Sequence, residues 1–459
     1  MHNISEYLNV IGDFACETES GTISMLGSLV RSEKNDNCII FRARIPQVDI
    51  RSYRTDSLDL HGVINKTKIS LVNCYMEASS GCYNDAYVNA VFGLDKIVIG
   101  AHYKGEKNVR RISAQFPALN NFFMSRFAVE PNANIVKEYH SEYQPLSADS
   151  SFGRISVIPT LTTYSDFHHH EFRATPKISY TFHELKSLDS AIAHILSIRN
   201  LFSFLADGYI DISYVEYSSD PLNRPESYGD RVTVILNQIE QIEEIDEPFL
   251  ITRELVAKCF QPIVDNWLTF YQKGIHIPRL FFEIITDRSK GINRFLNLAQ
   301  AIEVYSQYFR DKEAKKVFNA DPESKQTQDT PIKLWLKTLC SFSRSWNNPT
   351  LKHRLIDIFT FLQDVIEVSD DEIIQLAKNI SNNRNFFVHY SRNRKEPASL
   401  TVSSTCLLLR YVIIALVYRK IGVSAEAIRD CKNQGKYTFL NIAIKDILEN
   451  ESKPKTVLE

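Results

Sequence analysis

The sequence lacks the short motifs by which several large enzyme classes are recognised. Its 459 residues include 15 glycines, and these form neither a P-loop nor a dinucleotide-binding loop. The motifs G-x-S-x-G and H-E-x-x-H are absent as well. Such motifs supply backbone donors for phosphate groups, an exposed nucleophilic serine or two zinc-binding imidazoles. Their absence argues against NTP hydrolysis, serine hydrolysis and zinc proteolysis by the usual mechanisms.

An excess of one charge and a long apolar run are also missing. The 53 basic and 55 acidic residues give a formal net charge of −2, so any contact with nucleic acid has to come from a local patch. The longest apolar run, 406–418, is short for a bilayer and contains Arg410, and residues 1–10 resemble no signal peptide. We therefore expect a cytoplasmic protein with no membrane partner.

Eight cysteines are present, and no two of them form a C-x-x-C pair. A chain of this length can bury enough apolar surface to fold without disulfide bonds. We interpret the cysteines as reduced thiols, most of them buried.

The N-terminal half is rich in short β-branched and aromatic segments separated by Gly, Asn, Asp and Ser, which predicts a sandwich or a barrel-like sheet over residues 1–130. A small α/β unit over 131–248 is expected to follow, with the order β-β-α-β. An acidic run at 238–247 marks its end, and a solvated linker or helix face explains that run best. The predicted strands of the first domain are 7–14, 22–30, 38–45, 58–64, 68–76, 86–92, 95–102 and 110–116, and the elements of the α/β unit are 154–162, 171–182, 187–205 and 209–216.

Helical periodicity dominates residues 249–459, so the fold class is α+β and multidomain, with an all-α bundle after the β-rich half. The polar segment 311–330 is predicted to be a loop. The predicted helices are 252–273, 279–286, 292–310, 332–343, 351–368, 369–390, 400–421, 425–431 and 438–449.

The helix predicted over 369–390 carries the most informative residues. Ser369 and Glu372 have the spacing of a capping box, which places the helix start there. At about 100° per residue, an apolar stripe runs along Ile373, Ala377, Ile380, Phe387 and Val388. Arg384 falls in the middle of this stripe. A guanidinium keeps its charge when buried, so we expect it to be paired or used.

Glu303 is the expected partner of Arg384. In the helix predicted over 292–310, Ile292, Leu296, Ala299 and Ser306 share a face, and Glu303 lies near its centre. A purely structural buried ion pair between the two charges is an alternative to a functional role.

His389 lies about 140° around the helix from Arg384, on a polar flank with Ser381, Asn382 and Asn385. Asn385 precedes His389 by four residues and can hydrogen-bond its ring. Further aromatic and basic side chains that can contact a base or phosphates follow the helix. They are Tyr390, Arg392, Arg394 and Lys395.

The segment Arg384-Asn385-Phe386-Phe387-Val388-His389 resembles the ribonuclease motif of the HEPN superfamily, and the β-rich half followed by a helical half resembles the ApeA-type anti-phage HEPN proteins. The same loose spacing recurs at Arg54 and His61, in a strand-like region that offers no helical bundle. The resemblance implies a metal-independent endoribonuclease that needs no cofactor. Its motif covers Arg384, Asn385 and His389, which we expect to be catalytic, and we expect Glu303 and Tyr390 to support them.

The same resemblance implies a homodimer in which two motif helices face each other, transfer RNA as a candidate substrate, and abortive infection as the outcome. It also implies that the N-terminal half senses a phage-derived trigger. Two alternatives remain: a catalytically inactive HEPN module that binds a partner, and a ligand-sensing protein that signals to a partner.

His168, His169 and His170 form the one histidine run. In a strand the first and third would share a face and could bind a metal with help from His183 or Asp166. A surface turn explains the run more simply, because no Cys or carboxylate spacing supports a metal site.

Overall fold

A computed structural model of the chain forms two compact units. The sheet unit comprises Met1–Arg199 and Ile210–Glu244, and the helical unit comprises Asn200–Tyr209 and Ile245–Glu459. The prediction of three domains is finer than this division and stays a prediction. The residues that the structure describes are 4–18, 21–33, 35–46, 57–81, 86–105, 107–119, 122, 146–165, 170–212, 214–219, 232–236, 250–285, 291–322, 348–389 and 397–449.

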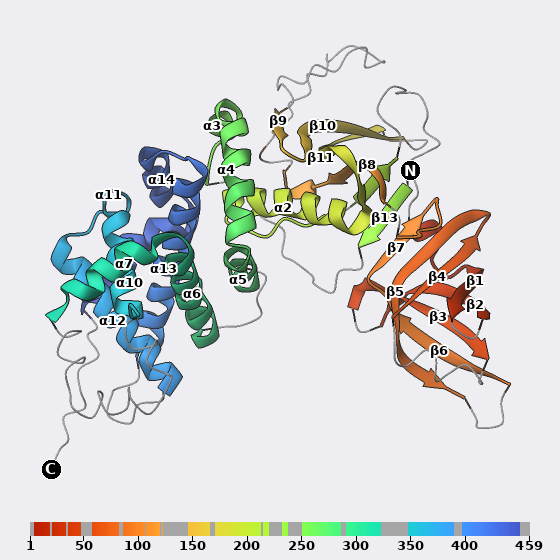
Figure 1. The fold of residues 1–459 in the computed structure, drawn as a ribbon, viewed down its shortest axis with the longest axis horizontal. Coiled ribbons are helices and arrows are strands. Elements are labelled where there is room, and N and C mark those ends of the chain that lie inside the picture. Colours follow the sequence, from red (N-terminus) through yellow and green to blue (C-terminus); the bar gives the residue numbers. More distant parts are fainter. Residues whose placement is uncertain are drawn as a thin grey trace. The chain divides into compact units, whose positions relative to one another are not determined.

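Within the described residues, the strands of the sheet unit join into one antiparallel sheet (Figure 1). Six strands close on themselves, because β4 pairs with both β1 and β5. The N-terminal sheet is therefore a barrel with the spatial order β4-β1-β2-β3-β6-β5. These strands are β1 (Ile11–Thr18), β2 (Gly21–Ser32), β3 (Asn35–Pro46), β4 (Leu58–Ile64), β5 (Thr67–Ser80) and β6 (Tyr87–Gly93).

Alternating apolar side chains fill the barrel. Phe14, Met25 and Leu29 are buried among them, and the Phe14 ring meets that of Phe41 edge-on at 4.7 Å. Gly62 lets β4 approach β1 closely, because a Cβ there would lie 2.4 Å from the Asp13 carbonyl oxygen. The outward-facing residues of the same strands remain open to solvent.

The rest of the sheet continues from the barrel through β7, and α2 (Leu188–Ala206) follows β11 along the chain. The predicted order β-β-α-β is confirmed by β10, β11, α2 and β12. Two short strands, β9 and β13, were not predicted. The strands beyond the barrel are β7 (Lys96–Ile99), β8 (Lys107–Gln115), β9 (Leu146–Ser150), β10 (Gly153–Ser165), β11 (His170–Ser187), β12 (Tyr214–Ser218) and β13 (Val232–Leu236).

The helical unit begins with the last turns of α2, well before residue 249. Asp207, whose side chain is buried in this unit, accepts hydrogen bonds from Arg410 Nε at 2.8 Å and from the Tyr437 hydroxyl at 2.6 Å, and Lys436 Nζ lies 2.6 Å from it. Phe204 stacks on Phe281 at 4.2 Å. Residues 200–209 are therefore part of the helical core.

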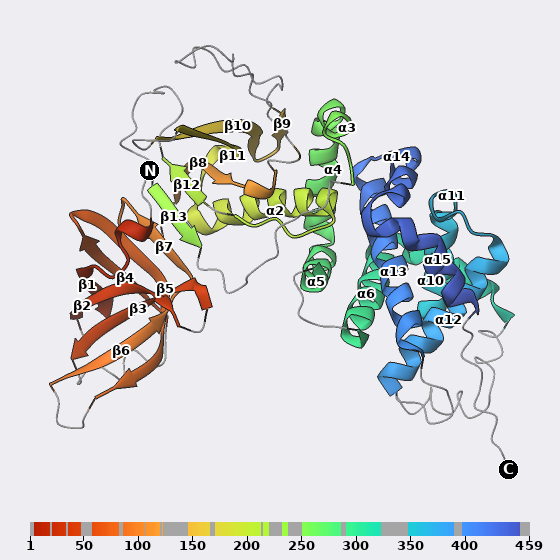
Figure 2. The same ribbon diagram turned by 180° about the vertical axis from the view of Figure 1, so that it is seen from behind.

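Helix α13 (Ser399–Ile421) packs against four other helices of this unit, α4, α6, α14 and α15 (Figure 2). Helix α13 is long and apolar enough to cross a bilayer, but 72% of its apolar window is buried in the protein and Arg410 pairs with Asp207. It is therefore a core helix of this unit. The other described helices are α3 (Arg253–Lys258), α4 (Phe260–Lys273), α5 (His276–Ile285), α6 (Ile292–Tyr305), α7 (Asp311–Ala320), α10 (Leu351–Phe361), α11 (Gln363–Ile366), α12 (Asp370–His389), α14 (Ala425–Asp430) and α15 (Leu440–Glu449).

The prediction of a loop over 311–330 is wrong for its first ten residues, which form α7. Ala314 and Phe318 are buried on one side of α7, and Lys315 pairs with Asp311 one turn earlier. Two apolar residues at a spacing of four are enough for a short amphipathic helix when a neighbour covers them. Residues 323–330 of that segment, the predicted helix 332–343 and the acidic run 238–247 lie outside the described residues.

Candidate active site

Helix α12 presents the candidate site, and its start has the predicted cap. The Ser369 backbone N–H and hydroxyl donate to Glu372 Oε2 at 2.7 and 2.9 Å, and the Glu372 N–H donates to Ser369 Oγ at 3.4 Å. These bonds stabilise the ionised carboxylate and lower the pKa of Glu372. The described helix runs from Asp370 to His389, and residue 390 of the predicted range lies outside the described residues.

The apolar stripe of α12 is confirmed at Ile373, Ala377, Ile380 and Phe387, which are all buried. The Phe387 ring meets that of Phe295 on α6 at 6.0 Å. Val388 was expected in the stripe, but it is 43% exposed. It lies in the last turn, at the edge of the contact with α6.

The polar flank is less exposed than predicted, because α12 packs against α10, α6 and α15. Ser381 is buried, as is Asn383, which was not singled out. Asn379 donates from Nδ2 to the Ile447 carbonyl at 2.9 Å, which ties α12 to α15. Asn385 is exposed. The accessible part of the predicted flank is therefore its C-terminal end.

Arg384 and Glu303 meet as predicted. Arg384 Nη2 lies 3.8 Å from Glu303 Oε2, and the two side chains are 30% and 26% exposed. Each is thus half-buried, and the guanidinium keeps an accessible edge. Arg384 Nη1 also approaches Asn385 Oδ1 at 3.5 Å.

The remaining predicted residues are placed only in part. His389 is the last residue of α12, five positions after Arg384, and its side chain is outside the description. Tyr390, Arg392, Arg394 and Lys395 also lie outside the described residues. Their assignments therefore stay predictions.

The predicted face of α6 is confirmed at Ala299 and Ser306, which are buried, but not at its start. Ile292 is exposed and Leu296 is half-buried, whereas Phe295 and Ile302 are buried. The buried face is rotated toward Phe295, because that ring packs against Phe387 of α12. Glu303 consequently lies at the margin of the face, where it reaches Arg384.

Arg354 is a buried cation near this site that the sequence reasoning did not single out. It donates from Nη1 to Ser306 Oγ at 3.1 Å and from Nε to the Pro349 carbonyl at 3.3 Å. Burial lowers the pKa of Arg354, and the negative charges of Asp311 and Glu303 oppose this effect. Arg354 lies on the apolar face of α10. A charged residue within an apolar stripe was the pattern that identified Arg384, and the same pattern is present at Arg354.

Ser306 begins a π-helical turn, Ser306–Arg310, that directly continues α6. Such turns are rare and are often found at functional sites. At its end, Arg310 binds Asp357 of α10 through two hydrogen bonds of 2.7 and 2.9 Å. The bond to Asp357 raises the pKa of Arg310. This bidentate pair fixes the π-helical turn, which begins three residues after Glu303, against α10.

The other histidine sites have different outcomes. His168, His169, Asp166 and Arg54 lie outside the described residues, and His170 begins β11 with its side chain not described. His61 lies on β4, and its side chain is on the outer face of the barrel. Among the side chains that the structure describes, no three His, Cys, Asp or Glu residues gather as a metal site would require. A metal site at residues 168–170 therefore stays a prediction.

The predicted thiols are confirmed where the structure describes them. Six cysteines are free, and four of these are buried. Burial raises the pKa of Cys431 to about 12, so this thiol stays protonated and unreactive at neutral pH.

Comparisons with known proteins cover most of the chain. Residues 9–267 match the family described as ApeA N-terminal domain 1, and residues 296–427 match Apea-like HEPN. The second match spans α6 to α14 and includes Glu303, Arg384 and His389. No curated protein and no solved structure matches the chain. The first match alone exceeds half of the 459 residues, so the chain belongs to the ApeA family of anti-phage HEPN proteins.

Proposed function

We propose that the chain is a metal-independent endoribonuclease in which Arg384 and His389 act on the scissile phosphate of RNA. The observation that carries the proposal is the state of Arg384. It is held near Glu303 at 3.8 Å, it is 30% exposed, and it lies five residues before His389 on one helix. A guanidinium that is oriented and still accessible can bind a phosphate through two donors.

The chemistry needs a base, an acid and stabilisation of negative charge. The 2′-hydroxyl of RNA attacks the adjacent phosphorus, the bond from phosphorus to the 5′-oxygen breaks, and the products are a 2′,3′-cyclic phosphate and a 5′-hydroxyl. His389 is the candidate for proton transfer, since the unperturbed imidazole pKa is about 6.5. Arg384 offsets the charge that grows on the phosphoryl oxygens. Asn385 orients the imidazole or contacts the phosphate.

Two facing copies of α12 complete the proposed site. Arg384 and His389 lie about 140° apart on the helix, so one copy alone does not aim both side chains at the same phosphate. Phe295 of α6 packs against Phe387, beside the exposed Val388. An exposed apolar side chain beside the motif is suited to an interface with a second copy of the chain.

The substrate and the biological outcome are proposed from family membership. Transfer RNA is the candidate substrate, and its cleavage would halt translation in an infected cell. Tyr390, Arg392, Arg394 and Lys395 would supply stacking and phosphate contacts beside the site.

The sheet unit is proposed to restrain the nuclease until a phage product is present, because an unrestrained ribonuclease would damage its own host. Restraint requires the trigger to bind the released state more tightly than the restrained one. RNA cleavage should therefore appear in infected cells and be absent from uninfected cells that express the same amount of protein. Equal cleavage in both would contradict restraint.

The mechanism is tested with purified full-length protein, total bacterial RNA and excess chelator. We expect cleavage to continue, and the products to carry 2′,3′-cyclic phosphate and 5′-hydroxyl ends. Loss of cleavage that magnesium restores, or products with 5′-phosphate ends, would indicate a metal-dependent nuclease instead.

A further inference from the structure

A groove of about 750 Å³ lies on the outer face of the barrel, and the ribonuclease proposal does not use it. Strand pairing places its lining residues on one side of the sheet. Asp13 pairs with both Leu26 and Val63, and Leu26 pairs with Arg44. Directly paired residues point to the same face, and the buried Phe14 next to Asp13 points inward. The volume is in the range of small-molecule sites.

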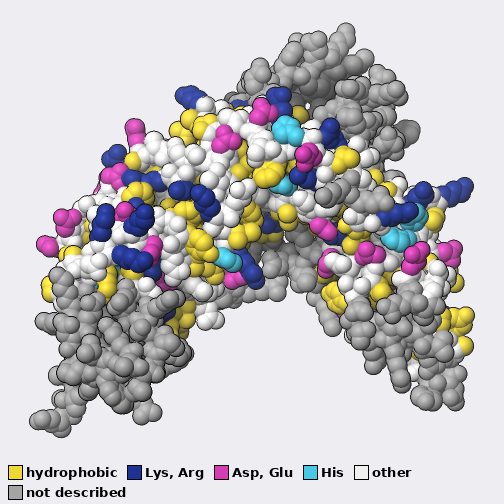
Figure 3. All heavy atoms as spheres, in the orientation of Figure 1, with side chains coloured by type: hydrophobic (Ala, Val, Ile, Leu, Met, Phe, Trp, Pro, Cys, Tyr) yellow, Lys and Arg dark blue, Asp and Glu magenta, His cyan; other side chains and the backbone are white. Residues whose placement is uncertain are grey.

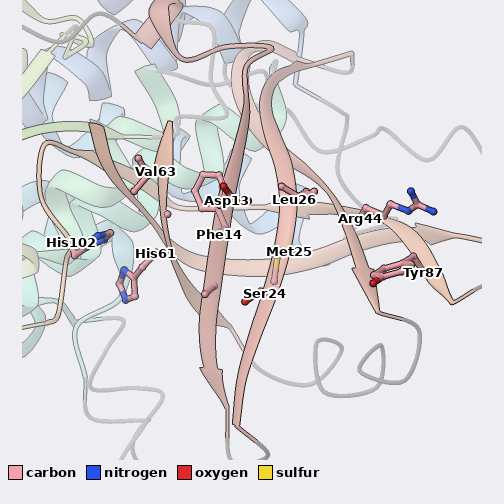
Figure 4. Close-up of a pocket in the computed structure, with 12 residues that line it drawn as sticks. Asp13, Phe14, Ser24, Met25, Leu26, Arg44, His61, Val63, Tyr87 and His102 are labelled. Atoms are coloured by element: carbon pink, nitrogen blue, oxygen red, sulfur yellow. The ribbon is translucent and has the colours of Figure 1, made fainter. Parts of the chain in front are cut away.

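The polar groups of the groove are separated into two ends. Figure 4 shows His61 and His102 together at one end and Arg44 and Tyr87 together at the other. Asp13 and Leu26 lie between these ends. A ligand that fills the whole groove therefore contacts imidazoles at one end and a carboxylate beside apolar surface in the middle. At the other end it contacts an aromatic ring and a guanidinium.

The histidine end is suited to an anion. His61 Nδ1 is hydrogen-bonded to Ser70 Oγ at 2.9 Å, which fixes the ring and leaves Nε2 to meet a ligand. The His102 ring lies edge-on to His61 at 5.7 Å, and within the described part of the chain its Nδ1 is shielded from solvent without a hydrogen bond. A shielded polar atom of this kind calls for a partner.

Basic side chains gather at the same end. The pKa of His102 is lowered by burial and by the nearby charges of His61, Lys68 and Lys104. Four basic groups therefore act on one small region. An anion placed among them would be attracted by the two lysines and would favour the protonated form of His102.

The aromatic end is suited to a planar ring. The Arg44 guanidinium lies 5.1 Å from the centre of the Tyr87 ring, and Tyr87 is 49% exposed. Nucleobases stack on tyrosine rings and on guanidinium planes. The Asp13 carboxylate can accept hydrogen bonds from ribose hydroxyls or from an exocyclic amino group.

We propose that the groove binds a nucleoside phosphate, with the phosphate between His61 and His102 and the base against Tyr87 and Arg44. The proposal does not depend on RNA cleavage by the helical unit. Charge on the surface seen in Figure 3 is otherwise mixed, with basic and acidic side chains interspersed. A local arrangement is therefore needed to select this ligand, and the groove provides one. A free mononucleotide and a nucleotide within single-stranded RNA share this chemistry.

The test is a binding titration of full-length protein with the four ribonucleoside 5′-monophosphates, inorganic phosphate and the four nucleosides. We expect at least one mononucleotide to bind, and phosphate or nucleoside alone to bind at least roughly tenfold more weakly, because each occupies one end of the groove. A short single-stranded oligoribonucleotide distinguishes the sources. Tighter binding than the mononucleotide assigns the groove to RNA, and equal or weaker binding assigns it to the free nucleotide.

Variants locate the site. Tyr87→Ala should weaken nucleotide binding about 5- to 150-fold, the range for a lost base–aromatic stack. His102→Ala should weaken binding of the mononucleotide and leave binding of the nucleoside unchanged. Tyr75→Ala is the matched control, because Tyr75 on β5 is 45% exposed and does not line the groove. The proposal is overturned if no mononucleotide binds at millimolar concentration, or if Tyr87→Ala binds as the wild type does while melting at the same temperature.

Discussion

Arg384 is oriented by Glu303 without being buried by it. The two charged groups are 3.8 Å apart, and each side chain is about one third exposed. Solvent screens ion pairs of this kind, and they contribute roughly 0–1 kcal/mol to stability. Function and stability are therefore separable at this residue.

Arg384→Ala should remove RNA cleavage and change the free energy of unfolding by less than about 1 kcal/mol, because the lost pair is half-exposed. Arg384→Lys should also lose most activity, since an ammonium cannot bind phosphate through a planar fork. RNA cleavage and thermal melting are the measurements. Arg279→Ala is the control, because Arg279 is largely exposed on α5 and pairs with Glu283 one turn later. Cleavage by Arg384→Ala at the wild-type rate would remove Arg384 from the site.

The meeting of Arg384 with Glu303 was predictable from sequence, because each charge interrupts an apolar stripe. The exposure of Val388 was not, since helical periodicity does not tell where a neighbouring helix ends. The pairs of Arg354 with Ser306 and of Arg310 with Asp357 depend on the π-helical turn after α6. A single extra residue in a turn leaves no mark in apolar spacing, so these contacts required the structure.

At the scale of elements, the capping box of α12 links sequence directly to the site, because it sets where the helix begins. Ser369→Ala should cost about 0.5–2 kcal/mol of stability, as losses of serine caps do. Glu372→Gln tests the charge. The pKa of Glu372 is lowered in the folded protein, so its stabilisation is present above the unfolded pKa and is lost as pH falls through the folded value.

Denaturant titrations over a pH series measure this effect. The destabilisation caused by Glu372→Gln at pH 7 should shrink as the pH falls below about 4, where the unfolded carboxyl is protonated. Asp371→Asn, one residue earlier on the same exposed turn, is the control. A Glu372→Gln penalty that does not change with pH would show that the carboxylate charge plays no part in the cap.

Element types were predictable where periodicity is strong, as at α13 and β4. Predictions failed where the contacts that stabilise an element come from distant residues. Strand β13, five residues long, is held by pairing with β7 and β12. Closure of the barrel likewise depends on the pairing of β4 with both β1 and β5, which no local pattern encodes.

Asp207 explains why the helical unit begins in α2. Its side chain is almost fully buried and meets Arg410, Lys436 and Tyr437. Asp207→Asn should cost about 3–5 kcal/mol, because Arg410 would stay buried without its countercharge. Asp265→Asn, at an exposed position on α4, is the control for thermal melting. Equal melting temperatures of the two variants would contradict this role of Asp207. If Asp207 has this role, any fragment of the helical unit has to include residues 200–209.

For the whole molecule, the proposed mechanism requires assembly, because Arg384 and His389 lie about 140° apart around one helix. We expect a homodimer through the helical unit, with both Arg384 side chains near the two-fold axis. Val388→Glu should dissociate the dimer in sedimentation and reduce cleavage at least about tenfold, because a carboxylate would be buried in the interface. Ile442→Glu, at an exposed apolar position on α15, is the control. A fully active monomer would rule out a shared site.

We propose that His389 transfers the proton during RNA cleavage, and replacing this side chain alone should stop the reaction. Purified wild type, His389→Ala and His276→Ala are incubated with total bacterial RNA, where His276 is an exposed histidine at the start of α5. We predict cleavage by the wild type and by His276→Ala. His389→Ala should lose at least about 100-fold, as expected for removal of a general acid or base, with little change in melting temperature. Cleavage by folded His389→Ala at the wild-type rate would contradict the account.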